Sequence, residues 1–255
     1  MLKLSGKVSV FSAKGARPYQ EDRFVSIKKE IPNQEAGWLL AVMDGHIGLE
    51  TVEFCAKNLE SFFDQSVGEK NQVDEEVLKN TVKLLNEKTR HLATSSTISL
   101  VFVSETNSKV LVAVLGDSPV IVLDYNGEVH ISPEHNVRTN ISERKAAVRR
   151  GAYYSGGYIW VGELGLQMAR ALGDYCLDAV LSREPEVYTI NLGPGSFIIV
   201  ASDGVFDPEH SETANQIKRI VDLIRNNLTF DAKNLVNDAI SRQTHDNATA
   251  IIWKA

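Results

Sequence analysis

Three long apolar runs along the chain each end close to an aspartate. An apolar stretch of this length, without the alternating polar residues of a half-exposed strand, predicts a strand buried on both faces. Each strand would deliver a carboxylate where it ends, and strands that share a sheet would bring these carboxylates together. The runs and their aspartates are 38–43 with Asp44, 110–115 with Asp117, and 197–202 with Asp203.

The remaining apolar residues change between strand-like and helical spacing in blocks. Spacings of three and four residues predict one pair of consecutive helices early in the chain and a second pair late in it. Short apolar runs bounded by turn residues predict strands before, between and after these pairs. This order is typical of an α+β fold rather than of a parallel βαβ sheet. The predicted helices lie within 52–63, 73–92, 212–226 and 231–242, and the predicted strands are 8–11, 24–27, 38–43, 97–103, 110–115, 120–123, 128–131, 186–190, 197–202 and 247–253.

Three local predictions concern the middle of the chain. Residues 97–131 are expected to form one meander of antiparallel strands, with a hairpin turn at Asn126-Gly127. A short basic helix should follow over 142–150, and Ser142 is its candidate N-cap. The glycine- and tyrosine-rich segment 151–165 is expected to be an irregular loop.

Composition and charge narrow the functional classes. The 255 residues are 43% hydrophobic and 24% charged, which suits one packed domain. The formal net charge of −6 argues against a general nucleic-acid binder, because such proteins are usually basic. The two cysteines, Cys55 and Cys176, form no zinc-ligand spacing, and no run approaches the roughly 18 apolar residues of a membrane span. We therefore expect a cytoplasmic monomer without a signal peptide, and without a nucleic-acid or membrane partner.

Seven acidic residues stand at predicted strand ends or in short turns. A single Asp-Gly pair is usually only a turn, but the joint pattern predicts a cluster. Clustered carboxylates repel one another and burial raises their pKa values, and a bound cation removes this cost. Oxygen ligands favour Mg²⁺ or Mn²⁺, and two such ions about 3.5–4 Å apart can share a water and present it for attack at phosphorus. The acids are Glu21, Asp22, Asp44, Asp117, Asp203, Asp207 and Asp246.

Two basic side chains complete this hypothesis. Arg17, four residues before Glu21, could anchor a phosphate with its planar guanidinium, although a solvated surface arginine is the alternative. His46, two residues after Asp44, could protonate a leaving group, although a structural histidine is the alternative. The chain has no GxxxxGK[ST] phosphate loop and no GxSxG nucleophile elbow. Ser118 could be a serine nucleophile, but the sequence places no histidine or aspartate partner beside it.

Seven short motifs follow one another along the chain: Arg17-x-x-x-Glu21-Asp22, Asp44-Gly45-His46-x-Gly48, Ser96-Thr97, Gly116-Asp117-Ser118, Arg170-Ala171-Leu172-Gly173-Asp174, Asp203-Gly204-Val205-Phe206-Asp207 and Asp246-Asn247-Ala248-Thr249. In this order they resemble those of the metal-dependent serine/threonine protein phosphatases of the type 2C (PPM) class, from about Val8 to Trp253. The resemblance implies a four-layer αββα sandwich, in which two packed antiparallel β-sheets are flanked by helix pairs. It also implies one catalytic domain over 1–255, with a short substrate-side flap around 136–164.

The resemblance assigns ligands to two Mg²⁺ or Mn²⁺ ions. Asp44 would bridge both ions. Asp203 and Asp246 would hold one of them, and Glu21 with the backbone carbonyl of Gly45 would hold the other. The expected reaction is hydrolysis of phosphoserine and phosphothreonine monoesters in phosphoproteins, by attack of the water that bridges the ions.

Further roles follow from the same resemblance. Asp117 and Asp207 match positions that hold a weaker third ion in some relatives. Asp22 would act on the ligands from behind, without touching an ion. Arg17 would bind the phosphate, and His46 would act as general acid.

The sequence also departs from the family pattern at four places. Ile47 stands where the family usually has glycine, so the backbone after His46 has less conformational freedom. Ser95, Pro119 and Ala169 replace a glycine, an arginine and a serine. Two alternative functions stay open: a pseudophosphatase that uses the same fold as a binding module, and a phosphohydrolase that acts on a small molecule.

Overall fold

The computed structural model describes residues 4–31, 35–68, 72–206, 213–227 and 229–255. The helices in these residues are α1 (Glu50–Val67), α2 (Glu75–Thr89), α3 (Ile141–Arg149), α4 (Thr213–Asn226) and α5 (Ala232–Ser241), with short 3₁₀ turns at Tyr175–Leu177 and Asp203–Val205. The strands are β1 (Lys7–Ala13), β2 (Arg23–Ile31), β3 (Glu35–Met43), β4 (Gly45–His46), β5 (Ser95–Ser96), β6 (Ile98–Ser104), β7 (Lys109–Leu115), β8 (Val120–Leu123), β9 (Val129–Ile131), β10 (Tyr153–Ser155), β11 (Tyr158–Val161), β12 (Leu164–Leu166), β13 (Leu172–Gly173), β14 (Glu186–Asn191), β15 (Phe197–Ala201) and β16 (Ala248–Lys254).

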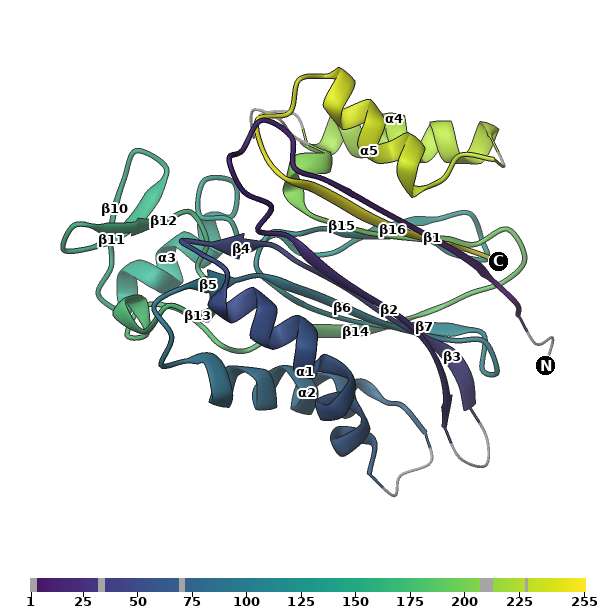
Figure 1. Ribbon diagram of the computed structural model, residues 1–255, viewed down its shortest axis with the longest axis horizontal. Helices are drawn as coiled ribbons and strands as arrows, with labels where there is room; N and C mark the ends of the chain where they lie inside the picture. The colour runs from purple at the N-terminus through teal and green to yellow at the C-terminus, as the bar shows by residue number, and fades with distance from the viewer. Residues whose placement is uncertain (1–3, 32–34, 69–71, 207–212, 228) are drawn as a thin grey trace.

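Two antiparallel sheets of five strands each lie face to face in the described part of the chain (Figure 1). One sheet has the strand order β1-β16-β15-β8-β9, and α4 and α5 cover its outer face. The other has the order β14-β7-β6-β3-β2, and α1 and α2 cover its outer face. The predicted α+β class and the four-layer αββα arrangement are therefore confirmed.

Strand β3 shows why the apolar runs are continuous. Its residues Leu39, Ala41 and Met43 face helices α1 and α2, while Leu40 and Val42 face the opposite sheet. Successive side chains of a strand point to opposite faces, so a strand at the centre of four layers needs apolar residues at every position. The same reasoning applies to β7 and β15, whose buried residues also divide between two cores.

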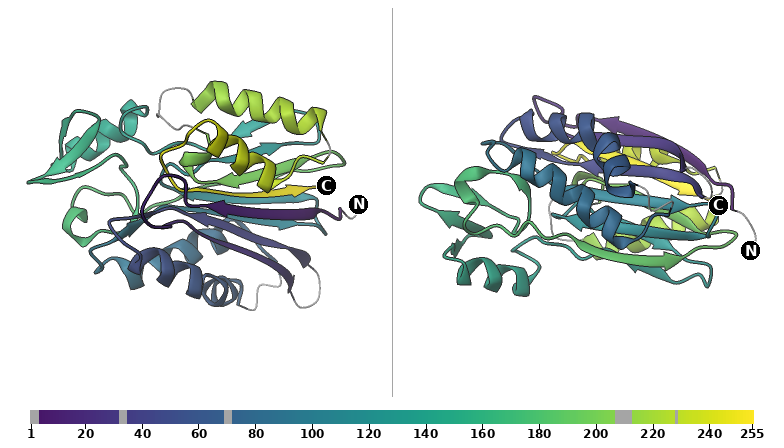
Figure 2. Two further views of the ribbon diagram at one scale, coloured as in Figure 1. Left: turned by 45° about the horizontal axis from the view of Figure 1, so that its top comes forward. Right: turned by 90° about the horizontal axis from the view of Figure 1, so that it is seen from below.

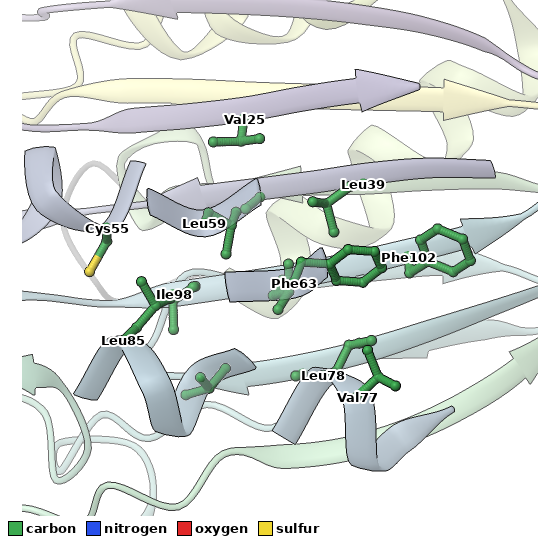
Figure 3. Packing of buried hydrophobic residues seen from close by; sticks show 14 of the residues in the cluster. Val25, Leu39, Cys55, Leu59, Phe63, Val77, Leu78, Leu85, Ile98 and Phe102 are labelled. Atoms are coloured by element: carbon green, nitrogen blue, oxygen red, sulfur yellow. The ribbon is translucent and has the colours of Figure 1, made fainter. Parts of the chain in front are cut away.

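The helix pair α1 and α2 is tied to its sheet by an aromatic and aliphatic cluster (Figure 3). Phe63 on α1 stacks on Phe102 of β6, with ring centroids 5.5 Å apart. Asp74 caps α2, because its side chain accepts a hydrogen bond from the backbone N–H of Val77.

Among the described residues, no helix combines the length and the apolar character that crossing a membrane would require.

The predicted meander over 97–131 is wrong at one connection. Strands β6 and β7 pair in one sheet, but β8 and β9 pair in the other, so the chain crosses between the sheets over 116–119. Gly116 takes a φ of 119°, which favours glycine, and Pro119 has no N–H to continue a ladder. The hairpin at Asn126-Gly127 is confirmed, with Gly127 at a φ of 81°.

The segment expected to be an irregular loop is ordered instead. Strands β10, β11 and β12 form a small antiparallel sheet beside α3, at the end of the sandwich away from both termini (Figure 2). Buried residues of this unit, including Ile159 and Ala147, form their own core. Buried and exposed residues do not follow one regular pattern along these short strands, so apolar periodicity in the sequence did not predict them. Helix α3 begins after Asn140 rather than Ser142, because the Asn140 side chain accepts hydrogen bonds from the backbone N–H groups of Ser142 and Glu143.

Ile47 adopts a left-handed backbone conformation, with a φ of 65°. This conformation costs a non-glycine residue on the order of 1–2 kcal/mol, and a β-branched side chain is poorly suited to it. The side chain is 66% exposed, so little packing compensates for the strain. The sequence predicted reduced backbone freedom at residue 47 because glycine is absent there. In the structure, Ile47 is a strained residue.

We predict that Ile47→Gly stabilises the protein by about 1 kcal/mol, since relief of strain exceeds the greater flexibility of glycine in the unfolded chain. Urea unfolding of the metal-free protein measures this change. Ile131→Gly is the matched control, because Ile131 is 49% exposed on strand β9 and has no positive φ. The control should destabilise the protein, and an equal destabilisation by Ile47→Gly would contradict the strain argument.

Candidate active site

Most of the predicted site residues line one cleft. Strands β4 and β5 and the small sheet β10–β12 lie at the same end of the sandwich (Figure 1). The cleft has a volume of about 240 Å³. Asp44 and Asp117 follow strands of one sheet, while Asp203 and Asp246 lie beside strands of the other. The aspartates therefore meet across the two sheets. The sequence had instead suggested that strands of a single shared sheet would bring them together. The lining residues are Arg17, Glu21, Asp44, Gly45, His46, Ile47, Asp117, Tyr158, Gly165, Leu166, Gln167, Met168, Asp203, Asp246 and Asn247.

Asp44 is held at the floor of this cleft by Thr97. The backbone N–H of Asp44 donates to Thr97 Oγ1 at 3.0 Å, and the backbone N–H of Thr97 donates to the Asp44 carbonyl at 2.9 Å. Thr97 Oγ1 also lies 2.7 Å from Ser118 Oγ. A side chain at Gly116 would collide with Thr97, since a Cβ there would lie 2.6 Å from the Thr97 Cβ. The Ser118 hydroxyl therefore braces the site, and this placement does not support a nucleophilic role.

Gly45 and His46 are fixed by a small sheet in which β5 pairs with both β4 and β13. A Cβ at Gly45 would lie 2.7 Å from the Glu21 carbonyl, so glycine permits the close approach of these two backbones. His46 Nδ1 lies 3.2 Å from the Asp44 carbonyl oxygen. Because a carbonyl can only accept, Nδ1 carries the proton there and Nε2 remains for another partner.

The loop that carries Arg17 and Glu21 is attached to the C-terminal strand by Asn247. The Asn247 side chain accepts from the backbone N–H of Glu21 at 2.8 Å and donates to the carbonyls of Lys14 and Tyr19. Arg17 Nη2 lies 2.8 Å from Asp246 Oδ2. Asn247 had no assigned role from the sequence, although its position directly after Asp246 was a usable signal.

Asp22 lies behind the cleft and does not line it. Ser202 Oγ donates to Asp22 Oδ2 at 2.8 Å and accepts from the backbone N–H of Thr249 at 3.0 Å. Burial raises the pKa of Asp22 to about 6, opposed by its hydrogen bonds with Thr249 and Ser202. This position agrees with an indirect action on the ligands.

Burial and mutual repulsion both make the charged forms of the acids in the cleft costly. Loss of hydration raises the pKa of Asp44 well above its ordinary value, and the charges of Asp22, Asp203 and Asp246 raise it further. The pKa of Asp203 is raised for the same reason, with the Asp117 charge as the largest neighbouring contribution. Such a set of carboxylates is costly to keep ionised unless cations neutralise it.

The donor set fits hard divalent cations. All the acidic groups of the cleft offer oxygen, which Mg²⁺ and Mn²⁺ prefer. Asp117 Oδ1 is buried and has no hydrogen-bond partner among the described residues, so a cation could satisfy it. Asp207, the remaining predicted ligand, lies outside the described residues.

Sequence reasoning missed several residues that surround the cleft. Tyr158 lines it from within the predicted flap, and Gln167 and Met168 line it from just beyond the predicted end of the flap. Asn136 donates from Nδ2 to Asp117 Oδ2 at 2.9 Å. No pattern of spacing could reveal these contacts, because they join segments that are brought together only by folding.

Comparisons with known proteins agree with this geometry. The family model described as Protein phosphatase 2C matches residues 6–248. "Protein phosphatase 1L" of Bos taurus is 27% identical over 98% of this chain and 72% of its own length. The serine-threonine phosphatase 2C structure from Toxoplasma gondii has a TM-score of 0.73 at 22% identity, covering 96% of this chain and 93% of that one.

A further similar structure contains metal. The catalytic domain of the serine threonine protein phosphatase PstP, in complex with two manganese ions, has a TM-score of 0.63 at 19% identity. The alignment covers 98% of this chain and 97% of that domain. At this identity the likeness establishes the fold, while the family model spans most of the sequence. The chain therefore belongs to the protein phosphatase 2C family, the metal-dependent protein phosphatases.

Proposed function

We propose that this chain hydrolyses phosphoserine and phosphothreonine monoesters of proteins at the cleft around Asp44. The observation that carries the proposal is the convergence of four aspartates and Glu21 with one arginine and one histidine in a single cleft. Asp44 would contact both ions, Asp203 and Asp246 one of them, and Glu21 with the Gly45 carbonyl the other. When bound, two Mg²⁺ or Mn²⁺ ions supply charge neutralisation and a water of lowered pKa for attack at phosphorus.

The residues around the ions have separate tasks. Arg17 would orient the substrate phosphate through its guanidinium, exchanging Asp246 for phosphate oxygens. In its imidazolium form, His46 would donate the Nε2 proton to the leaving alkoxide and become neutral, while its Nδ1–H stays on the Asp44 carbonyl. Asp22 would orient its neighbours, and Asp117 with Asp207 would hold a weaker additional ion.

The proposal extends to the whole chain. Residues 1–255 would form one catalytic domain, in which the segment 136–164 acts as the substrate-side flap, supported by Tyr158 in the cleft wall. We propose a cytoplasmic monomer that acts on phosphoproteins rather than on nucleic acid, supported by the net charge of −6. The binding-module alternative is not favoured, because the acids assigned to the two ions are all present. A phosphohydrolase for small molecules would instead prefer sugar phosphates or nucleotides to phosphopeptides in the same assay.

Asp44→Asn tests the metal site. We expect turnover of a phosphothreonine peptide to require Mn²⁺ or Mg²⁺, to stop with a chelator, and to fall at least about a hundredfold in the variant, since an amide is a poor ligand for a hard ion. The metal-free variant should be more stable than the metal-free wild type at pH 7, because the neutral amide avoids the cost that burial and the neighbouring acids place on the charged Asp44. The gain should shrink at acidic pH, because an acid with a raised pKa in the folded state loses its charging penalty once it is protonated.

Asp222→Asn is the matched control, because Asp222 is exposed on α4. It should change neither turnover nor unfolding. Normal turnover in Asp44→Asn would contradict the site assignment, and absence of turnover in the wild type with either metal would contradict the function.

A further prediction concerns phosphate binding by Arg17. Arg17→Ala should raise KM about tenfold or more with a smaller change in kcat, since the lost contact is made to the bound phosphate before the reaction. Arg17→Lys should recover part of the loss, because it keeps the charge without the planar fork. Steady-state kinetics on one phosphopeptide measures both constants, and an unchanged KM in Arg17→Ala would exclude this role.

Another prediction concerns proton transfer by His46. His46→Gln should slow hydrolysis of a phosphoserine peptide about ten- to a hundredfold more than that of an aryl phosphate, because a phenolate needs less protonation as it leaves. His91→Gln, at an exposed histidine, serves as the control. Equal losses on both substrates would argue against general-acid catalysis by His46.

A further inference from the structure

Asn136 hydrogen-bonds to one of the two carboxylate oxygens of Asp117. Asn136 Nδ2 donates to Asp117 Oδ2 at 2.9 Å, and both residues are buried, at 2% and 8% exposure. Asp117 Oδ1 has no hydrogen-bond partner in the described residues, yet Asp117 lines the catalytic cleft. A buried carboxylate with one satisfied and one unsatisfied oxygen is suited to bind a cation through the second.

The orientation of the Asn136 amide is determined by its other contacts. Its Oδ1 accepts from the backbone N–H of Arg138 at 2.9 Å, which forms a local turn at the start of the flap. Since the amide oxygen is the acceptor in this turn, the NH₂ group must face Asp117. The Asn136 carbonyl accepts from the backbone N–H of Asn140 at 2.9 Å, and Asn136 forms a bridge with Met168 in the cleft wall. Both the nitrogen and the oxygen of the Asn136 amide are therefore held by hydrogen bonds, and the backbone contacts fix the position of the residue.

The residue before it holds the backbone next to Asp117. The backbone N–H of Gly116 donates to His135 Nδ1 at 3.0 Å, and the backbone N–H of His135 donates to the Gly116 carbonyl at 3.1 Å. The His135 carbonyl accepts from the backbone N–H of Ala169 at 2.9 Å. His135, just before the flap, thus fixes the backbone of Gly116, and Asn136, the first residue of the flap, fixes the side chain of Asp117.

We propose that Asn136 is a positioning residue, which holds Asp117 Oδ2 so that Asp117 Oδ1 can bind a divalent cation in addition to the two at Asp44. This inference rests on the proposed metal-dependent function. Because Asn136 also begins the flap and pairs with Met168, the hydrogen bond joins the flap to this additional cation site. Loss of this hydrogen bond should weaken binding of the additional ion, while the affinities for the two ions at Asp44 should not change.

Calorimetric titration of the metal-free protein with Mn²⁺ tests the proposal. Asn136→Ser keeps an acceptor for the Arg138 N–H but is too short to reach Asp117. We expect the weakest Mn²⁺ binding phase to weaken about tenfold, as for the loss of one hydrogen bond to a charged group, while the tighter phases keep their affinities. Asn136→Thr should behave in the same way and replaces the serine variant if that variant does not fold.

Asn140→Ser is the control for general loosening of the flap. It removes the bond from Asn140 Nδ2 to the Glu134 carbonyl but keeps a side chain that can cap α3, so all Mn²⁺ phases should match the wild type. Combining Asn136→Ser with Asp117→Asn should weaken the last phase no further than Asp117→Asn alone, since both changes act on one contact.

The outcomes separate this inference from the proposed function. If the wild type binds Mn²⁺ tightly and turns over substrate but Asn136→Ser matches it in every phase, the role of Asn136 is wrong and the function stands. Equal weakening of all phases in Asn136→Ser would also overturn the positioning role. A wild type that binds no Mn²⁺ in any phase contradicts the proposed function itself.

Discussion

The mutual repulsion of buried carboxylates is the constraint on which the active-site end of this protein depends. Asp44, Asp117, Asp203 and Asp246 share one cleft, where their charges raise the pKa values of Asp44 and Asp203 on top of the effect of lost hydration. Such groups remain ionised side by side only where cations offset their charge, and a rigid backbone keeps them in place. The four-layer architecture supplies the rigidity, because each aspartate lies beside a strand buried in two cores.

The cleft is held rigid by hydrogen bonds between residues that lie far apart in the sequence. Thr97 brackets Asp44, Asn247 attaches the Glu21 loop to the last strand, and Ser202 supports Asp22. Each of these hydrogen bonds uses a neutral side chain, so it fixes an acid or its backbone without adding charge to the cleft. Ile47, whose β-branched side chain makes its left-handed conformation costly, lines the cleft, where this turn directs the chain from His46 into α1.

Much of this arrangement could be predicted from the order of residues. Apolar periodicity predicted both helix pairs and the central strands, because burial between layers imposes the spacing of side chains directly. Positions at predicted strand ends and in turns singled out seven acids, and the family resemblance assigned their roles. Of these acids, Glu21, Asp44, Asp117, Asp203 and Asp246 line one cleft, and Asp22 lies behind it. The meander over 97–131 and the loop over 151–165 were wrong, since hydrogen-bonding partners of a strand are not specified by its own periodicity.

By itself, the sequence determined the fold class, the four layers through its family resemblance, and the acids available to bind cations. These features depend on local composition and on motifs of fixed order. Only the tertiary structure decided that the chain changes sheets at Gly116–Pro119, that the acids meet across both sheets, and that Asn136 takes one oxygen of Asp117. Hydrogen bonds are directional and short, so contacts between residues far apart along the chain exist only once packing has fixed both partners in place.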